Sequence, residues 1–115
     1  MHKIHIKKPS LPIINFEDLD KEIKNLEENS HYKSFSLYNN LGNLYLLKGD
    51  IERAKENYHK AFKINPFSPS ANYNLGYLYF LEGKIKEAYE KFVFCLKLNP
   101  LDTDAYFMLK KSILY

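Results

Sequence analysis

The residues that could carry chemistry are few and widely separated in this 115-residue chain. The one cysteine, Cys95, has no histidine at a related helical position that could deprotonate it, so a catalytic thiol is not expected. It stands where a matching segment 34 residues earlier has Ala61, and we interpret it as a small buried hydrophobic residue. A single cysteine also excludes a disulfide within the chain, which fits a reducing compartment.

The other groups that could bind a metal or catalyse a reaction are equally isolated. His2 and His5 lie close together near the start without a further credible ligand, and His31 and His59 stand alone. Most carboxylates fall three or four positions from a lysine on helical segments, which is typical of solvated helix faces. The four glycines do not form a phosphate-binding loop. We therefore expect no enzyme activity, no metal and no cofactor.

The composition indicates a single globular domain. Apolar residues make up 45% of the chain, charged residues make up 27%, and the formal net charge is only +3, which argues against nucleic acid as the partner. No apolar run approaches the ~18 residues of a membrane span. Residues 1–14, which read MHKIHIKKPSLPII, lack the apolar core of a secretory signal and show no helical period. We expect a flexible tail at 1–14 and a cytoplasmic location without membrane contact.

The chain contains an internal repeat with a period of 34 residues. Residues 35–68 align without a gap to residues 69–102, and 14 of the 34 positions are identical. For example, NLGNLYLLKG at 40–49 returns as NLGYLYFLEG at 74–83. The two copies are therefore predicted to be two versions of one structural unit.

Each copy is predicted to form two helices joined by a turn. The first helix should cover 36–48 and 70–82, capped by Ser36 and Ser70 or, in the second copy, by the Ser68-Pro69 pair. A glycine follows each of these helices and suits a left-handed residue at the helix end. The second helix should cover 51–64 and 85–98, each ended by an Asn-Pro pair.

The buried faces follow from a rotation of about 100° per residue. The stripe of the first helices combines large residues with one glycine, whereas that of the second helices combines aromatic or aliphatic residues with small ones. In the first helices the predicted stripe consists of Tyr38, Leu41, Gly42 and Tyr45, and of Asn72, Leu75, Gly76 and Tyr79. In the second helices it consists of Ala54, Tyr58, Ala61 and Phe62, and of Ala88, Phe92, Cys95 and Leu96.

This pattern resembles the tetratricopeptide repeat, whose 34-residue unit has a large residue, Leu-Gly, Tyr, then Ala, an aromatic residue and Pro at fixed spacing. Asn72 departs from it, because the family has an aromatic residue there, and the neighbouring Tyr73 could compensate. The resemblance implies an all-α fold, a short right-handed superhelix (α-solenoid) of two helix-turn-helix repeats. The matching residues are Tyr38, Leu41, Gly42, Tyr45, Ala54, Tyr58 and Pro66, and then Leu75, Gly76, Tyr79, Ala88, Phe92 and Pro100.

The segments that flank the repeats are predicted to close the ends of the stack. Residues 15–30 should form an N-terminal helix, capped by Asn15 and packed through a stripe of Phe16, Leu19, Ile23 and Leu26. Residues 103–115 continue the repeat frame as a third first helix, with Ala105, Tyr106, Leu109 and Ile113 on its core face. Lys110 replaces the glycine of the repeats, so this segment is interpreted as a capping helix over 85–98.

The resemblance implies a protein or peptide partner, bound in a concave groove that the first helices line. The second copy has aromatic residues at groove positions where the first copy has Asn39, Asn43 and Leu46. We therefore predict an uncharged, aromatic groove, which could hold an extended peptide or a helix, although packing between adjacent first helices would also explain these aromatic residues. The groove residues are Asn39, Asn43, Tyr73, Asn74, Tyr77, Phe80, Phe107 and Lys111.

Some members of this family grip the C-terminal carboxylate of chaperones with a clamp of lysine, arginine and asparagine. Of that pattern the chain matches only Asn43 and Asn74. The positions for cations hold Asn39, Asp104 and Met108. We therefore predict that the clamp is absent.

A homo-oligomer is the second hypothesis. Val93 and Phe94 replace His59 and Lys60 of the first copy at positions that normally face outward. They could contact the third helix or a second copy, or stay exposed. The predicted oligomer interface consists of Val93, Phe94, Leu114 and Tyr115.

Overall fold

The structure is a computed structural model that describes residues 15–29 and 33–114, without the side chain of Phe16. The described residues form helices and no strands, which confirms the all-α prediction. The helices are α1 (Phe16–Asn29), α2 (Phe35–Lys48), α3 (Ile51–Ile64), α4 (Pro69–Leu81), α5 (Ile85–Leu98) and α6 (Thr103–Ile113). Residues 1–14, and with them the predicted tail, lie outside the described part of the chain.

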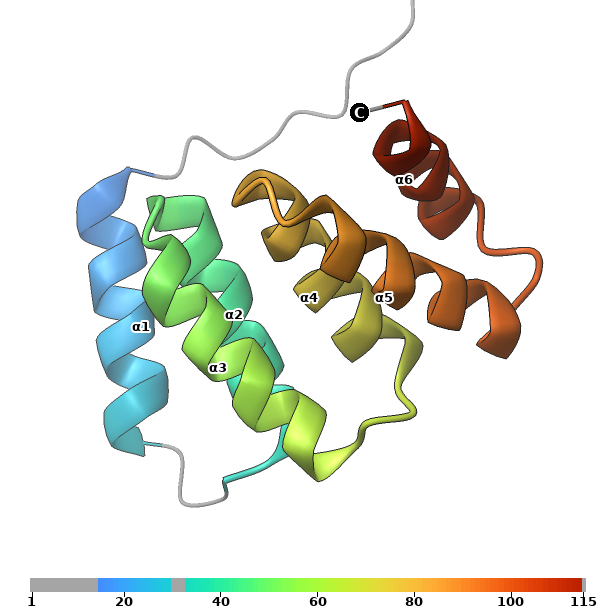
Figure 1. The fold of residues 1–115 in the computed structure, drawn as a ribbon. Coiled ribbons are helices and arrows are strands. Elements are labelled where there is room, and N and C mark those ends of the chain that lie inside the picture. Colours follow the sequence, from blue (N-terminus) through green and yellow to red (C-terminus); the bar gives the residue numbers. More distant parts are fainter. Residues whose placement is uncertain (1–14, 30–32, 115) are drawn as a thin grey trace, which may run out of the picture.

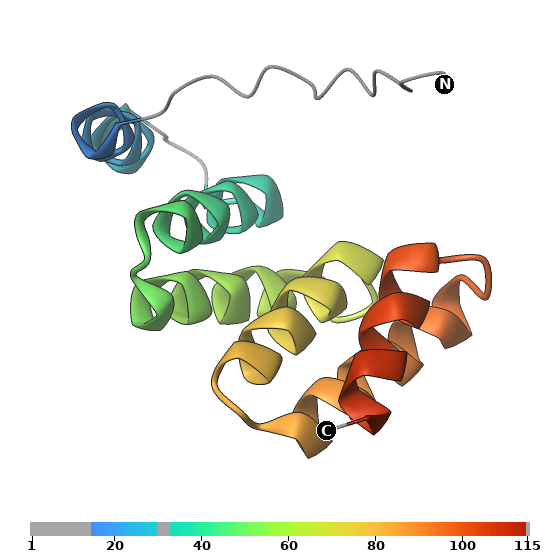
Figure 2. The same ribbon diagram turned by 90° about the horizontal axis from the view of Figure 1, so that it is seen from above.

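The helices are stacked in chain order. The pairs α2–α3 and α4–α5 are the two predicted helical hairpins, and α3 packs against α4 to join them. Figure 1 shows α1 at one end of this row and α6 at the other, and Figure 2 shows the successive hairpins turning relative to one another. An ion pair between Lys55 Nζ and Glu82 Oε2, 3.0 Å apart, also joins α3 to the end of α4.

The helix ends follow the turn chemistry of the sequence, with one correction. Gly49 and Gly83 adopt φ values of 88° and 78°, the left-handed conformation that glycine tolerates best. The cap of α4 is Ser68, as in the alternative prediction, and Pro69 is the first helical residue. The prediction of Ser36 as a cap is wrong, because α2 begins one residue earlier and the Oγ of Ser34 accepts from the Leu37 N–H at 3.1 Å.

A glycine and an aromatic ring form the centre of each repeat. Tyr58 and Phe92 are at most 1% exposed, and each lies against the glycine of its partner helix. A Cβ added to Gly42 would lie 2.4 Å from two ring atoms of Tyr58, and one added to Gly76 would lie 2.9 Å from Phe92. The two helices of each copy therefore approach each other closely at the glycine.

The two end helices are packed differently from each other. On α1, Asn15 Oδ1 accepts from the Asp18 N–H at 2.8 Å, and Leu19 and Ile23 are buried as predicted. The Tyr45 hydroxyl donates to Glu27 of α1, which ties this helix to the first repeat.

The core face predicted for α6 is partly wrong. The helix buries Ala105, Met108 and Ser112, while Tyr106 and Ile113 are 55% and 64% exposed. The reason is that, in the described chain, α6 packs against α5 and α4 only, so no helix covers the side on which Tyr106 and Ile113 lie.

Candidate functional site

The candidate site is the surface formed by α2, α4 and α6, which we call the first-helix face. The side chains that the sequence predicted for the groove come from these three helices. A hydrogen bond between α2 and α4 and direct packing of α4 on α6 hold the three helices side by side. The residues of the first-helix face are Asn39, Asn43, Tyr73, Asn74, Tyr77, Phe80, Phe107 and Lys111.

Three asparagines make up the polar part of this face. Asn74 Nδ2 donates to Asn39 Oδ1 at 2.8 Å, so one hydrogen bond fixes both amides across the gap between α2 and α4. The buried Tyr58 donates its hydroxyl to Asn43 Oδ1 from beneath. The oxygens of Asn39 and Asn43 are thus occupied, whereas their NH₂ groups have no partner in the described residues and can donate outward.

The aromatic residues of α4 have both a structural and an exposed part. Tyr73, Tyr77 and Phe80 are half-buried and pack against the second core cluster, which contains Phe92 and Met108. The rings of Tyr73 and Tyr77 are stacked with centroids 6.5 Å apart, and Tyr73 also meets Phe92 at 5.7 Å. Burial, followed by the charge of Asp104, raises the pKa of Tyr73. The rings therefore form a rigid wall with one edge open to solvent.

On the first-helix face α6 presents one apolar residue, Phe107, and one cation, Lys111. Phe107 is 58% exposed, and Lys111 Nζ lies 5.0 Å from the centre of its ring. Asp104 is exposed, and Met108 is only 5% exposed and belongs to the core. The positions of the carboxylate clamp on α6 thus present an acid and a buried thioether.

The residues of the predicted oligomer interface that the structure describes lie on α5 and just after the end of α6. Val93 and Phe94 are half-buried on α5, and the ring of Phe94 lies 6.4 Å from that of Phe67 in the loop between α3 and α4. A contact within the chain was one of the alternatives, but the sequence pointed to the third helix and not to this loop. Leu114 is 84% exposed after the end of α6, and Tyr115 lies outside the described residues.

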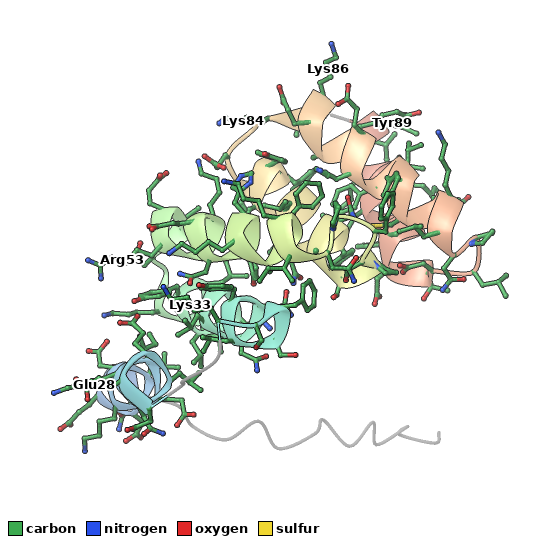
Figure 3. The ribbon with its side chains drawn as sticks, turned by 90° about the horizontal axis from the view of Figure 1, so that it is seen from below. Glu28, Lys33, Arg53, Lys84, Lys86 and Tyr89 are labelled. Carbon is green, nitrogen blue, oxygen red and sulfur yellow. The ribbon has the colours of Figure 1, made fainter. Side chains whose placement is uncertain are left out.

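Two hollows lie away from the first-helix face. One, of about 310 Å³, is lined by Phe62, Phe67 and Phe94 and by Lys91, whose pKa burial lowers. The other, of about 400 Å³, lies where α1, α2 and α3 meet. Lys33 and Arg53, which are labelled in Figure 3, are among the residues that line it. Its wall includes the buried Tyr45, whose pKa is raised to about 12 by burial and by Glu27.

The groups considered for chemistry are separate in space as well as in sequence. Cys95 is fully buried, its Sγ lies 3.6 Å from the carbonyl oxygen of Pro69, and burial raises its pKa to about 11. Burial and the charge of Lys55 lower the pKa of His59. Within 15–29 and 33–114 no three His, Cys, Asp or Glu side chains are grouped to hold a metal ion, and no helix is long and apolar enough to cross a membrane.

Sequence reasoning missed one exposed apolar residue. Leu101 is 85% exposed in the loop that leads into α6. It occupies the same place in the repeat as Phe67, whose ring lies 6.4 Å from that of Phe94 on the next second helix. The alignment of the two copies contained the signal for this exposure, because it pairs Leu101 with Phe67. In the described chain α5 follows α4 and lies near Phe67, whereas no helix follows α6 that could lie near Leu101 in the same way.

Comparison with known proteins supports the repeat architecture. Residues 42–83 match a family model described as TPR repeat, and residues 69–100 match one described as tetratricopeptide repeat. Together these matches span more than half of the chain. No curated protein matches the sequence.

Solved structures with the same fold are similar at low sequence identity. The first TPR of Spaghetti (RPAP3) bound to the HSP90 peptide SRMEEVD is 20% identical with a TM-score of 0.77, over 85% of this chain and 79% of that one. The second TPR domain of human RPAP3 with the HSP70 peptide SGPTIEEVD is 21% identical with a TM-score of 0.74, over 84% and 82%.

A thermophilic TPR protein of Thermus thermophilus is 22% identical with a TM-score of 0.75, and the match covers 86% of this chain but only 52% of that protein. At these identities the structural likeness shows the fold alone. The matched family models, the 34-residue repeat and the glycine–aromatic contacts agree, and the chain belongs to the tetratricopeptide repeat family.

Proposed function

We propose that this protein is an interaction module without catalytic activity that binds an uncharged segment of a partner protein on the first-helix face. The observation that carries the proposal is that the asparagine amides of α2, whose oxygens are already hydrogen-bonded, lie on the same face as the aromatic residues of α4 and Phe107 of α6. Tyrosine and phenylalanine supply contact area, and the tyrosine hydroxyls supply hydrogen bonds in a wet interface.

The polar groups suggest how a peptide backbone would be held. The NH₂ groups of Asn39 and Asn43 can donate to peptide carbonyl oxygens, because their own oxygens already accept hydrogen bonds. The stacked edge of Tyr73 and Tyr77 would then contact apolar side chains of the same segment. Because the asparagine amides and the tyrosine rings are already held in place before binding, less conformational entropy is lost when a peptide associates.

The charge of the site bears on which peptides it would bind. Two of those structures contain peptides that end in EEVD. In this chain Asn39 and Asp104 replace cations, and the first-helix face keeps one exposed cation, Lys111. We propose that the preferred partner segment is therefore neutral and apolar rather than acidic.

The experiment selects ligands from a displayed library of random peptides and measures their affinity for the purified chain and for Phe107→Ala. Phe107 is exposed, so its truncation should leave the fold intact and weaken binding about tenfold, equal to about 1.4 kcal/mol.

Phe67→Ala is the matched control, because Phe67 is 70% exposed but lies in the loop beside α5. Equal affinities of both variants and the unsubstituted chain, with unchanged circular dichroism, would refute the proposal. Selection of acidic C-terminal peptides would refute the proposed preference for neutral segments.

A further inference from the structure

The hollow beside Phe67 and Phe94 has a counterpart in the first repeat. The counterpart, of about 400 Å³, lies where α1, α2 and α3 meet, and its lining includes Lys33 and Lys60. Phe67 and Phe94 stand 34 residues after these two lysines, so the two hollows occupy the same place in successive repeats. We call the second one the aromatic hollow, and its lining includes Phe62, Phe67, Glu90, Lys91 and Phe94.

The apolar wall of the aromatic hollow is open to solvent. The ring centroids of Phe67 and Phe94 lie 6.4 Å apart with 35° between the ring planes, and Phe67 is 70% exposed. The helical hairpin does not require rings here, because the first copy forms the same hairpin with lysines at both positions. A volume of about 310 Å³ is at the lower end of ligand pockets, which suits a ligand with a single ring.

The acid on the rim of the aromatic hollow has no ion-pair partner in the described chain. In the first hollow, Glu56 Oε1 lies 3.5 Å from Lys60 Nζ. In the aromatic hollow Glu90 takes the place of Glu56, but Phe94 takes the place of Lys60. Glu90 is exposed and forms no ion pair within the described residues. The rim therefore presents a carboxylate that can accept from an ammonium group.

The cation next to this acid is unpaired as well. Lys91 stands where the first copy has Asn57, and within 15–29 and 33–114 it forms no ion pair. Its Nζ lies 4.0 Å from the centre of the half-buried Phe62 ring. Burial lowers the pKa of Lys91, because its ammonium group is shielded from water. A carboxylate on a ligand would compensate this poorly solvated charge.

We propose that the aromatic hollow binds a free aromatic α-amino acid such as phenylalanine, with its ring against the phenylalanine wall, its carboxylate on Lys91 and its ammonium group on Glu90. At neutral pH such a ligand carries both charges on groups attached to one carbon atom. Glu90 and Lys91 are consecutive residues that line the same hollow, so they match this arrangement. The ligand is small, and its dissociation constant is on the order of 1 mM.

The site is separate from the first-helix face and does not rest on the peptide-binding proposal. A residue inside a peptide chain has neither a free ammonium group nor a free carboxylate. The charges on the rim therefore select a free amino acid over a peptide segment.

The test follows amide chemical shifts of the isotopically labelled full chain as L-phenylalanine is added from about 0.1 to about 20 mM. Shifts around Phe67 and along α5 should saturate with a dissociation constant on the order of 1 mM. 3-Phenylpropionate lacks the ammonium group and phenethylamine lacks the carboxylate, so each should bind about fivefold more weakly. Glycine, which has both charges but no ring, should not bind.

Two substitutions test the roles of the charges. Glu90→Gln should make phenylalanine and 3-phenylpropionate bind equally, because the ammonium group then has no carboxylate to contact. Lys91→Asn, which restores the residue of the first copy, should make phenylalanine and phenethylamine bind equally for the corresponding reason. A general change in the fold would weaken all three ligands together and would not produce these equalities.

One further substitution tests the aromatic wall. Phe67→Ala should weaken phenylalanine binding at least about fivefold, since it removes an exposed ring of the wall. Leu101→Ala is the matched control, because Leu101 has the same place in the repeat and is 85% exposed, and it should leave the affinity unchanged. The proposal is overturned by the absence of saturable shifts up to about 20 mM, by equal binding of phenylalanine and its two analogues to the unsubstituted chain, or by full affinity in Phe67→Ala.

Discussion

Replacement of Gly42 by alanine is expected to destabilise the first repeat severely, although alanine is a better helix former than glycine. The new Cβ would lie 2.4 Å from Cδ1 and from Cε1 of Tyr58, well inside the ~3.5–4.0 Å at which carbon atoms make favourable contact. The ring cannot move aside easily, because it is 1% exposed and its hydroxyl is bonded to Asn43.

The magnitude follows from two opposing effects. Overpacking of a closed core costs about 1–3 kcal/mol, and an overlap of this size falls at the upper end. The gain in helix propensity returns up to about 1 kcal/mol. We expect Gly42→Ala to lower the free energy of unfolding by about 2 kcal/mol. At Gly76 the nearest atoms are 2.9–3.1 Å away, so Gly76→Ala should cost less than 1 kcal/mol.

Urea unfolding followed by circular dichroism measures both variants, and a Tyr58→Leu background provides the control. If the ring is the obstacle, Gly42→Ala should lose at least half of its effect when Tyr58→Leu is also present, since the rigid ring atoms are gone. The reasoning is refuted if Gly42→Ala is as stable as the unsubstituted chain, or if the two substitutions are simply additive.

Three further predictions concern ionisable groups. Burial raises the pKa of Tyr58 to about 12, so stability is fully present below pH ~10 and is lost as the pH rises towards 12, by up to about 3 kcal/mol. Tyr58→Phe should reduce this alkaline loss in pH-dependent unfolding. The pKa of His59 is lowered, mainly by burial and by Lys55, so stability should fall as the pH drops below about 6.5, and His59→Gln should flatten that slope. Cys95, with a pKa of about 11 and no exposure, should react with iodoacetamide at least about 100-fold more slowly in the native than in the unfolded chain; equal rates would contradict its buried position.

Much of the fold could be predicted because the residues that determine helix packing and helix ends recur at the same positions in both copies. Helical spacing placed Gly42, Tyr58, Gly76 and Phe92 on the buried stripes, and the structure shows that each glycine lies against the aromatic ring of its partner helix. The helix ends at Asn-Pro and at glycine were also predictable, since these residues act locally on the backbone.

Hydrogen bonds and side-chain exposures that depend on adjacent segments could not be predicted from the periodicity of a single helix. Helical spacing placed Asn72 on the buried stripe, and it is 2% exposed, but the spacing did not show that its Nδ2 donates to the carbonyls of Pro66 and Ser68. Among the described helices only α5 and α4 pack on α6, and Tyr106 is exposed, whereas periodicity alone placed it in the core.

The sequence predicted which residues lie on the candidate site, but not how they pack against the core. Helical spacing placed Tyr73, Tyr77 and Phe80 on the first-helix face. Their packing against Phe92 and Met108 depends on how far α5 and α6 approach α4, which no local pattern encodes. The prediction that these residues bind a peptide remains to be tested.

The most direct test of the central claim is a map of amide chemical-shift changes when a library-selected peptide is titrated into the isotopically labelled chain. The account predicts that the changes concentrate on Asn39, Asn43 and their neighbours in α2, on the aromatic residues of α4, and around Phe107 in α6. Changes confined to α3 and α5, or to the hollow lined by Phe62, Phe67 and Phe94, would contradict it.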